Sequence, residues 1–137
     1  MQRTLVLSIL FLIVLSMSAV AQTPTIERRI KGKTDVNINA GIFVTVKRDC
    51  TAGPLPAVRL LTPPTHGKVT LKQGRVRATN LKQCLGIDLP AFVAFYRSTR
   101  GFVGQDNFTI EVTGADGKVQ VQRITVTITG SGAGESL

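Results

Sequence analysis

The sequence predicts an all-β domain in which about seven short strands form a sandwich of two sheets. Three observations lead to this prediction. From Gln22 onwards, short runs alternate apolar and polar residues, and no run has the spacing of an amphipathic helix. Glycine, proline and asparagine separate the runs, as is typical of proteins made of short strands. The chain has 137 residues, enough for one domain with one modest core.

The first 21 residues read as a secretory signal peptide. Arg3 is the basic start, Leu5 to Met17 is almost wholly apolar, and Ala19-Val20-Ala21 supplies small side chains before a cleavage site. A membrane anchor is the alternative, but the apolar run is shorter than the ~20 residues that span a bilayer. We therefore expect a periplasmic or extracellular domain at residues 22–130, with no membrane span after signal cleavage.

The first half of the domain holds the less regular strands. A weak edge strand is predicted at residues 26–30, and short alternating strands follow at 36–38 and 42–46. Residues 57–61 form a short apolar strand that ends at two consecutive prolines, which cannot donate to a sheet ladder.

Two segments in the middle of the chain are more regular. Residues 67–79 are interpreted as a hairpin that turns at Gln73-Gly74, with Val69, Leu71 and Val76 on one face. Residues 91–97 are apolar on both faces, which is typical of a central strand.

The last two strands are predicted at residues 108–112 and 119–128, joined by a turn at Asp116-Gly117. In the second of them, the apolar positions change from odd to even numbers between 121 and 124. A strand cannot do this without turning its inward face outward, so we predict a β-bulge around Gln122-Arg123. Residues 131–137 are rich in glycine and serine and are interpreted as a flexible tail.

The domain contains two cysteines, Cys50 and Cys84. An even number of cysteines in an exported chain predicts a disulfide. The alternative is a redox pair, but redox cysteines usually lie close together in a Cys-x-x-Cys motif. A structural bond would stabilise the domain by about 3 to 4 kcal/mol, because it lowers the conformational entropy of the unfolded chain.

Residues 63–129 carry a characteristic order of motifs: Pro-x-His-Gly-x-Val, a tyrosine, a Gly-Phe-x-Gly-x-Asp-x-Phe segment and a Gly-containing turn. The residues that form these motifs are Pro64, His66, Gly67, Val69, Tyr96, Gly101, Phe102, Gly104, Asp106, Phe108, Val112 and Gly117. Their order resembles the bacterial cadherin-like and immunoglobulin-like repeats of secreted and surface proteins. The resemblance implies an immunoglobulin-like (cadherin-like) β-sandwich.

The glycine-bracketed start of the stretch at residues 100–112 is interpreted as a structural corner just before an alternating strand. Gly101 and Gly104 would let the backbone turn where a Cβ would clash, and Phe102 would fill the core. Asp106 would accept hydrogen bonds from nearby loop amides. A ligand-binding loop is the alternative role.

Little in the sequence points to catalysis, so we predict that the protein is not an enzyme. A catalytic triad needs a histidine beside a nucleophile and an acid, and the single histidine, His66, lies in a predicted turn. Zinc sites need several Cys and His residues, and calcium sites need clustered carboxylates. We expect no cofactor and no metal.

The formal net charge is +9, and the basic residues gather in the predicted hairpin. Lys68, Lys72, Arg75 and Arg77 are expected to project from one face, with Lys82 beside them. The patch would bind anionic polymers outside the cell; its alternative roles are solubility and protection of an exposed sheet edge. Nucleic acid is the less expected ligand, because the aromatic side chains that stack on bases are few.

These observations predict an exported, non-catalytic binding or structural module of the immunoglobulin-like or cadherin-like kind. Its partner would be an unknown protein or an anionic envelope polymer. Two alternatives remain open: a binder of extracellular or envelope polyanions, and an inhibitor of a secreted or periplasmic enzyme. The inhibitor would use the loop at residues 48–57, which otherwise only connects two strands.

Overall fold

The computed structural model describes residues 18–130 and has seven strands in two sheets, which confirms the predicted immunoglobulin-like sandwich. The predicted signal peptide and tail lie largely or wholly outside the described residues. The strands are β1 (Thr25–Lys33), β2 (Ile38–Phe43), β3 (Ala57–Thr62), β4 (Gly67–Arg77), β5 (Asp88–Ser98), β6 (Gly104–Thr113) and β7 (Val119–Thr129). In this part of the chain, no helix is long and apolar enough to cross a bilayer.

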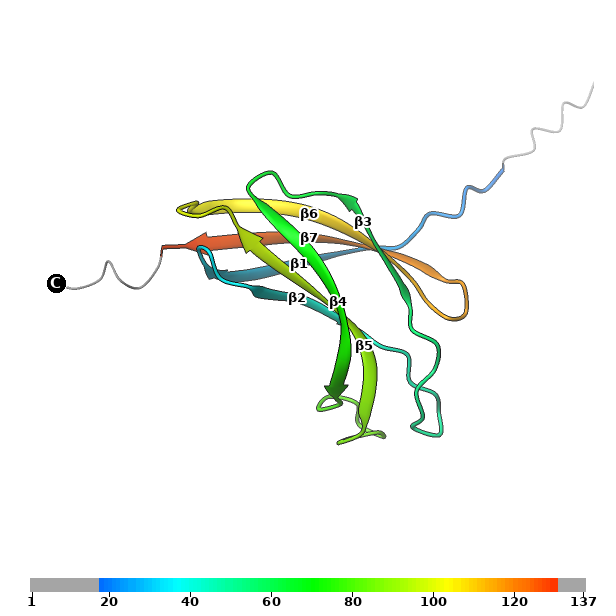
Figure 1. Cartoon of the computed structure of the whole chain (residues 1–137). Coiled ribbons are helices and arrows are strands. Elements are labelled where there is room, and N and C mark those ends of the chain that lie inside the picture. Colours follow the sequence, from blue (N-terminus) through cyan, green and yellow to red (C-terminus); the bar gives the residue numbers. More distant parts are fainter. Residues whose placement is uncertain (1–17, 131–137) are drawn as a thin grey trace, which may run out of the picture.

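The two sheets have different sizes and lie face to face (Figure 1). One has four strands in the order β1-β7-β6-β3, and the other has three in the order β2-β5-β4. β1 runs parallel to β7, and the other neighbours are antiparallel. The predicted central strand at residues 91–97 is confirmed, because β5 lies between β2 and β4.

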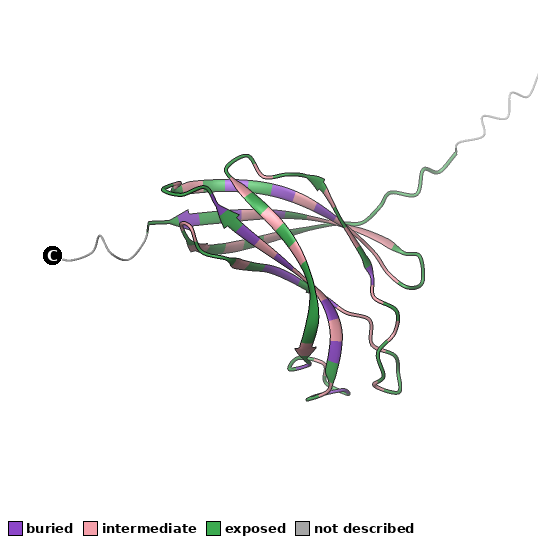
Figure 2. Ribbon diagram, in the orientation of Figure 1, coloured by how far each residue is buried: buried purple, intermediate pink, exposed green. Residues whose placement is uncertain are grey.

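The core lies between the sheets and is built mainly from alternate residues of β5, β6 and β7, with two residues of the edge strand β2. Buried and more exposed positions alternate along β6 and β7 (Figure 2). The buried residues that form the core cluster are Ala40, Phe43, Ala94, Tyr96, Phe108, Ile110, Ile124, Val126 and Ile128. Burying such side chains stabilises the fold by about 1.5 to 3 kcal/mol for each large aliphatic or aromatic group.

The predicted hairpin at residues 67–79 is wrong, because these residues form one continuous strand. β4 pairs with β5 from Gly67 opposite Ser98 to Arg77 opposite Asp88, without a register shift. Gly74 is an ordinary strand residue in this ladder and lacks the positive φ that a two-residue hairpin turn requires. A neighbouring strand of equal length therefore overrides the local turn signal.

The pair β4-β5 buries opposite faces at its two ends. In β5, Ala94 and Tyr96 are buried at one end, whereas Leu89 and Ala91 are buried at the other. Because side chains alternate along a strand, the two sets lie on opposite faces. The pair bends away from the four-stranded sheet (Figure 1), and Leu81 of the following loop shares a cavity lining with Leu89 on the outer face. The bend explains how an unbroken strand carries two apolar faces.

The bulge predicted at Gln122-Arg123 is also wrong. β7 keeps an unbroken register with β1 and with β6 across these residues. The inward position is taken by Gln122, opposite Ile110, and its Oε1 accepts a hydrogen bond of 3.0 Å from Arg28 Nη1. The same Nη1 donates to the carbonyl oxygen of Ala40 at 2.7 Å. The inward side chain of Gln122 is thus hydrogen-bonded to Arg28 of β1, so the strand needs no bulge to turn Gln122 outward.

Candidate anion-binding site

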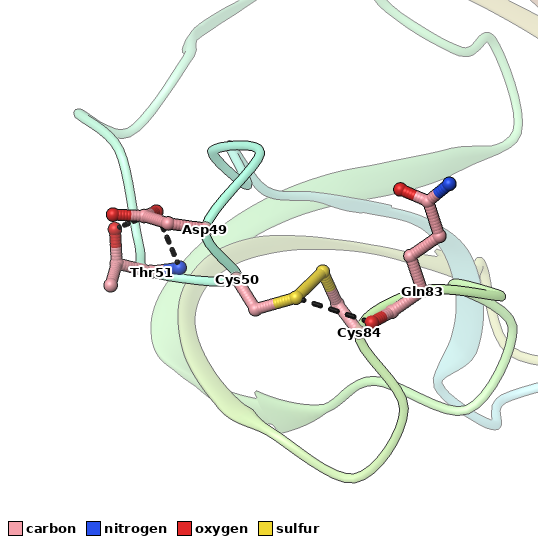
Figure 3. Close-up of a disulfide and its surroundings, with 5 residues drawn as sticks. All are labelled: Asp49, Cys50, Thr51, Gln83 and Cys84. Atoms are coloured by element: carbon pink, nitrogen blue, oxygen red, sulfur yellow. Dashed lines mark hydrogen bonds between the residues drawn. A yellow bond between two sulfur atoms is a disulfide. The ribbon is translucent and has the colours of Figure 1, made fainter.

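The predicted disulfide is confirmed: Cys50 is bonded to Cys84, with their Cα atoms 5.3 Å apart. It joins the loop after β2 to the loop between β4 and β5 (Figure 3). The Sγ of Cys50 lies 3.3 Å from the carbonyl oxygen of Gln83. This is a close contact and not a hydrogen bond, because a disulfide sulfur has no proton to donate. The bond is compatible with an oxidising periplasmic or extracellular environment.

A shallow depression of about 380 Å³ lies beside the disulfide. Its lining residues come from both loops and are Val46, Lys47, Arg48, Leu81, Lys82, Gln83 and Cys84. Three of these side chains are cationic, and all three residues are exposed. The disulfide therefore brings together cations that are more than thirty residues apart in sequence.

The cations of this depression form no ion pairs: among the described residues, no carboxylate pairs with Lys47, Arg48 or Lys82. The neighbouring Asp49 points toward Thr51 and away from the disulfide (Figure 3). Its Oδ1 accepts hydrogen bonds from the Thr51 hydroxyl at 2.6 Å and the Thr51 amide at 3.1 Å. These bonds, the hydroxyl first, lower the pKa of Asp49 below its ordinary value.

The basic residues of β4 lie on two faces of the sheet, so the prediction that they share one face is wrong. In a continuous strand, Lys68 and Lys72 point to the side opposite that of Arg75 and Arg77. The error follows from the hairpin interpretation, which added a turn between the two pairs. The five predicted cations therefore do not form a single patch, and Lys82 belongs to the depression at the disulfide.

Arg75, Arg77 and Lys72 have local partners. The Nη2 of Arg75 donates to the carbonyl oxygen of Asp88 at 3.1 Å, and the Nε of Arg77 lies 3.4 Å from the Asp88 carboxylate. The Nζ of Lys72 lies 5.8 Å from the centre of the Phe95 ring, within reach of a cation–π attraction. These contacts favour a role in covering the edge of the sheet.

The corner residue Asp106 is buried, with 3% of its surface exposed, and accepts four hydrogen bonds. Its Oδ1 accepts from the amides of Thr65 at 3.0 Å and Asn107 at 2.9 Å, and its Oδ2 from the amide of His66 at 2.9 Å and the Tyr96 hydroxyl at 2.8 Å. Burial alone would raise the pKa of Asp106, but these bonds lower it below its ordinary value. Burial and the neighbouring carboxylate raise the pKa of Tyr96. Both groups are used in holding the fold together.

Two glycines of the corner adopt positive φ, 80° at Gly101 and 138° at Gly104. A Cβ at Gly101 would meet no atom within 4 Å, and at Gly104 the nearest atom would be in the Phe102 ring at 3.4 Å. The reason for glycine is therefore backbone conformation, and not the steric clash that we had expected. Phe102 packs against the core and stacks on the imidazole of His66, with ring centroids 4.3 Å apart.

The sequence analysis identified some residues of the depression, but it did not predict that they lie together. It placed residues 48–57 in a candidate inhibitor loop and Lys82 in a basic hairpin. The signal that could have joined them is the disulfide itself, since Cys50 closely follows Lys47 and Arg48, and Cys84 closely follows Lys82. Fold and site together define a small, disulfide-bonded, all-β domain with a basic surface depression. No protein-family model and no curated protein matches this chain.

Proposed function

We propose that this protein is an exported, non-catalytic module of the immunoglobulin-like or cadherin-like kind. It binds anionic groups of an envelope or extracellular polymer at the disulfide-linked loops. One observation carries the proposal: Lys47, Arg48 and Lys82 surround one depression and form no ion pair with an acidic residue in the described chain. By contrast, the acidic residues that form ion pairs elsewhere are Glu27, Asp35, Asp88, Glu111 and Asp116.

The disulfide supports binding by limiting the freedom of both loops. Backbone hydrogen bonds add to this, because the amide of Lys47 donates to Thr51 at 2.9 Å and that of Gly53 donates to Thr45 at 2.9 Å. A site whose backbone is already ordered loses less entropy when a ligand binds. The positive field of the whole chain would also raise the rate at which an anionic polymer reaches the site.

The test compares two variants with equal changes in charge. Lys47→Glu/Arg48→Glu/Lys82→Glu removes the site, and Lys68→Glu/Lys72→Glu/Arg75→Glu is the matched control on β4. Retention on a heparin column is measured in a NaCl gradient. The first variant should elute at clearly lower salt than the control, because a local site and not net charge governs retention. Equal elution of the two variants would refute the site.

A second candidate function is inhibition of a secreted or periplasmic enzyme by residues 48–57. The same ordered loop favours it, because Thr51, Ala52 and Pro54 are exposed and the loop is tethered at Cys50. A rigid, exposed loop suits stoichiometric binding in an enzyme cleft. Replacement of residues 51–54 by Gly-Ser-Gly-Ser should abolish inhibition of a target enzyme while leaving heparin retention unchanged. Inhibition that survives this replacement would exclude the loop.

A further inference from the structure

The outer face of the four-stranded sheet carries a row of cations that the proposed function does not use. Along β1, Arg29, Lys31 and Lys33 are exposed, whereas Ile30 packs against the core from the other face. The parallel register places each cation beside a threonine of β7: Arg29 beside Thr125, Lys31 beside Thr127 and Lys33 beside Thr129. These threonines alternate with buried Ile124, Val126 and Ile128, so they lie on the outer face too.

The pattern extends to the next strand. Thr125 is paired with Asn107 of β6, and Thr127 is paired with Gln105. Two successive cross-strand rows, which we call levels, therefore each present a cation from β1, a hydroxyl from β7 and an amide from β6. Along the strand the levels repeat every ~6.6 Å, and across it neighbouring strands lie ~4.8 Å apart.

The hydroxyl and the amide at the first level are already arranged by a hydrogen bond. The Thr125 Oγ1 donates to Asn107 Oδ1 at 2.8 Å. Within residues 18–130, this leaves the Asn107 amide group as a free donor and the Thr125 oxygen as a free acceptor. Such a pair suits a ligand that carries its own hydroxyl groups.

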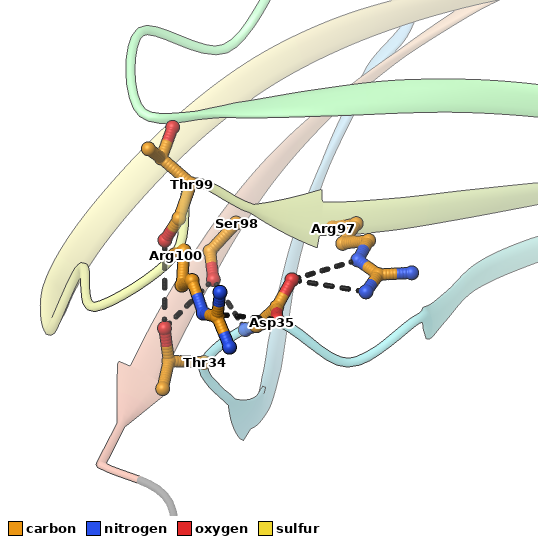
Figure 4. A network of polar contacts seen from close by, with 6 residues as sticks. All are labelled: Thr34, Asp35, Arg97, Ser98, Thr99 and Arg100. Carbon is orange, nitrogen blue, oxygen red and sulfur yellow. Dashed lines mark hydrogen bonds and ion pairs between the residues drawn. The ribbon is translucent and has the colours of Figure 1, made fainter.

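The carboxylates nearest to this row in sequence are neutralised by arginines. Glu27 of β1 lies 2.7 Å from the Nη1 of Arg123. Asp35, in the turn after β1, lies 2.9 Å from the Nη2 of Arg97 and 4.0 Å from the Nε of Arg100 (Figure 4). Among the described residues, no acid pairs with Arg29, Lys31 or Lys33. The row is therefore not neutralised by an ion pair within the described chain.

We infer that this face, which we name the β1 face, binds an extended acidic polysaccharide. The cations of β1 bind its carboxylates, and the threonines and amides of β7 and β6 bind its hydroxyl groups. Nucleic acid fits less well, because no aromatic residue lies on the described part of this face for base stacking. The β1 face is independent of the depression at the disulfide, since the C-terminal end of β1 and the disulfide-linked loops lie at different ends of the molecule (Figure 1).

Two variants of the full chain test the inference, with polygalacturonate as the probe. Arg29→Gln/Lys31→Gln/Lys33→Gln removes the charges, and Thr125→Val/Thr127→Val removes the hydroxyls while keeping β-branched side chains. The matched control is Lys47→Gln/Arg48→Gln/Lys82→Gln at the disulfide. Dissociation constants are measured by calorimetry in 50 mM NaCl, and unchanged thermal unfolding midpoints show that each variant folds.

The charge variant should weaken polygalacturonate binding at least tenfold more than the control does. The hydroxyl variant should weaken it several-fold while leaving oligothymidylate binding unchanged. Equal affinity of wild type and charge variant for polygalacturonate would overturn the inference. It would also be overturned if the wild type bound oligothymidylate or phosphatidylglycerol vesicles more tightly than polygalacturonate. A loss seen only in the control would refute the β1 face and leave the proposed function standing.

Discussion

The phenolic oxygen of Tyr96 lies 2.8 Å from Oδ2 of Asp106 and donates a hydrogen bond to it. Tyr96 belongs to β5 of the three-stranded sheet, and Asp106 belongs to β6 of the four-stranded sheet. The bond therefore joins the two layers of the sandwich. The same carboxylate receives the amides of Thr65 and His66, so it also fixes the loop before β4. A single buried charge organises one end of the domain.

Tyr96→Phe should lower the free energy of unfolding by about 1.5 to 3 kcal/mol, the usual contribution of a hydrogen bond to a charged group. The ring would keep its stacked contact with Phe108, whose centroid lies 5.9 Å away. Urea denaturation measures the change. A double-mutant cycle with Asp106→Asn should show coupling between the two sites, and additive effects would mean that the bond contributes nothing.

Asp106→Asn should lower the free energy of unfolding at neutral pH and should make that free energy less dependent on pH in the acidic range. The folded pKa of Asp106 lies below its ordinary value of 3.8, so its contribution is fully present above that pH and is lost as the pH falls through the folded pKa. The asparagine variant has no such proton to gain. Unfolding midpoints measured from pH 7 to pH 2 should therefore converge for the two proteins, and parallel curves would be inconsistent with this role.

Gly104→Ala should destabilise the domain by about 1 to 3 kcal/mol, because an L-residue is strained at a φ of 138°. Gly74→Ala is the matched control: Gly74 also lies in a strand, its φ is not positive, and an added Cβ would meet no atom within 4 Å. The control should be neutral or stabilising by a few tenths of a kcal/mol. Thermal unfolding of the two variants compares them, and equal losses would argue against backbone strain at Gly104.

Cys50→Ser/Cys84→Ser should lower the free energy of unfolding by about 3 to 4 kcal/mol in the chain-entropy model. The bond closes a loop with a sequence separation of 34 residues. The variant should also elute earlier from heparin, because Lys47 and Lys82 would no longer be held in one depression. Chemical denaturation and the salt gradient measure the two effects. Unchanged retention in a folded variant would show that the disulfide does not organise the cations.

Much of the fold could be predicted because it depends on local pattern. Period-two alternation locates strands such as β6 and β7, and an even cysteine count predicts the disulfide. The wrong hairpin and the wrong bulge both depend on distant partners. The Gln73-Gly74 pair looks like a turn, yet β5 pairs with it from more than fifteen residues away. The apolar shift in β7 looks like a bulge, yet Arg28 satisfies Gln122 from the other end of the chain.

The candidate sites were harder to predict for the same reason. Cations are easily seen in a sequence, but their grouping depends on which strand face or loop carries them. One incorrect turn placed Lys72 and Arg75 on the same face, whereas alternation along β4 separates them. The β1 face needed the parallel register of β1 with β7, which joins the two ends of the domain. Neither arrangement follows from local sequence alone.

Titration of the ¹⁵N-labelled protein with heparin oligosaccharide, followed by amide chemical shifts, would locate anion binding residue by residue. We predict that the shifts at residues 46–48 and 81–84, around the depression at the disulfide, saturate together, and that shifts along the β1 face form a separate set. These shifts should weaken as NaCl is raised, because the contacts are between exposed charges. Shifts confined to β4, or small shifts spread evenly over every basic residue, would contradict the proposed site.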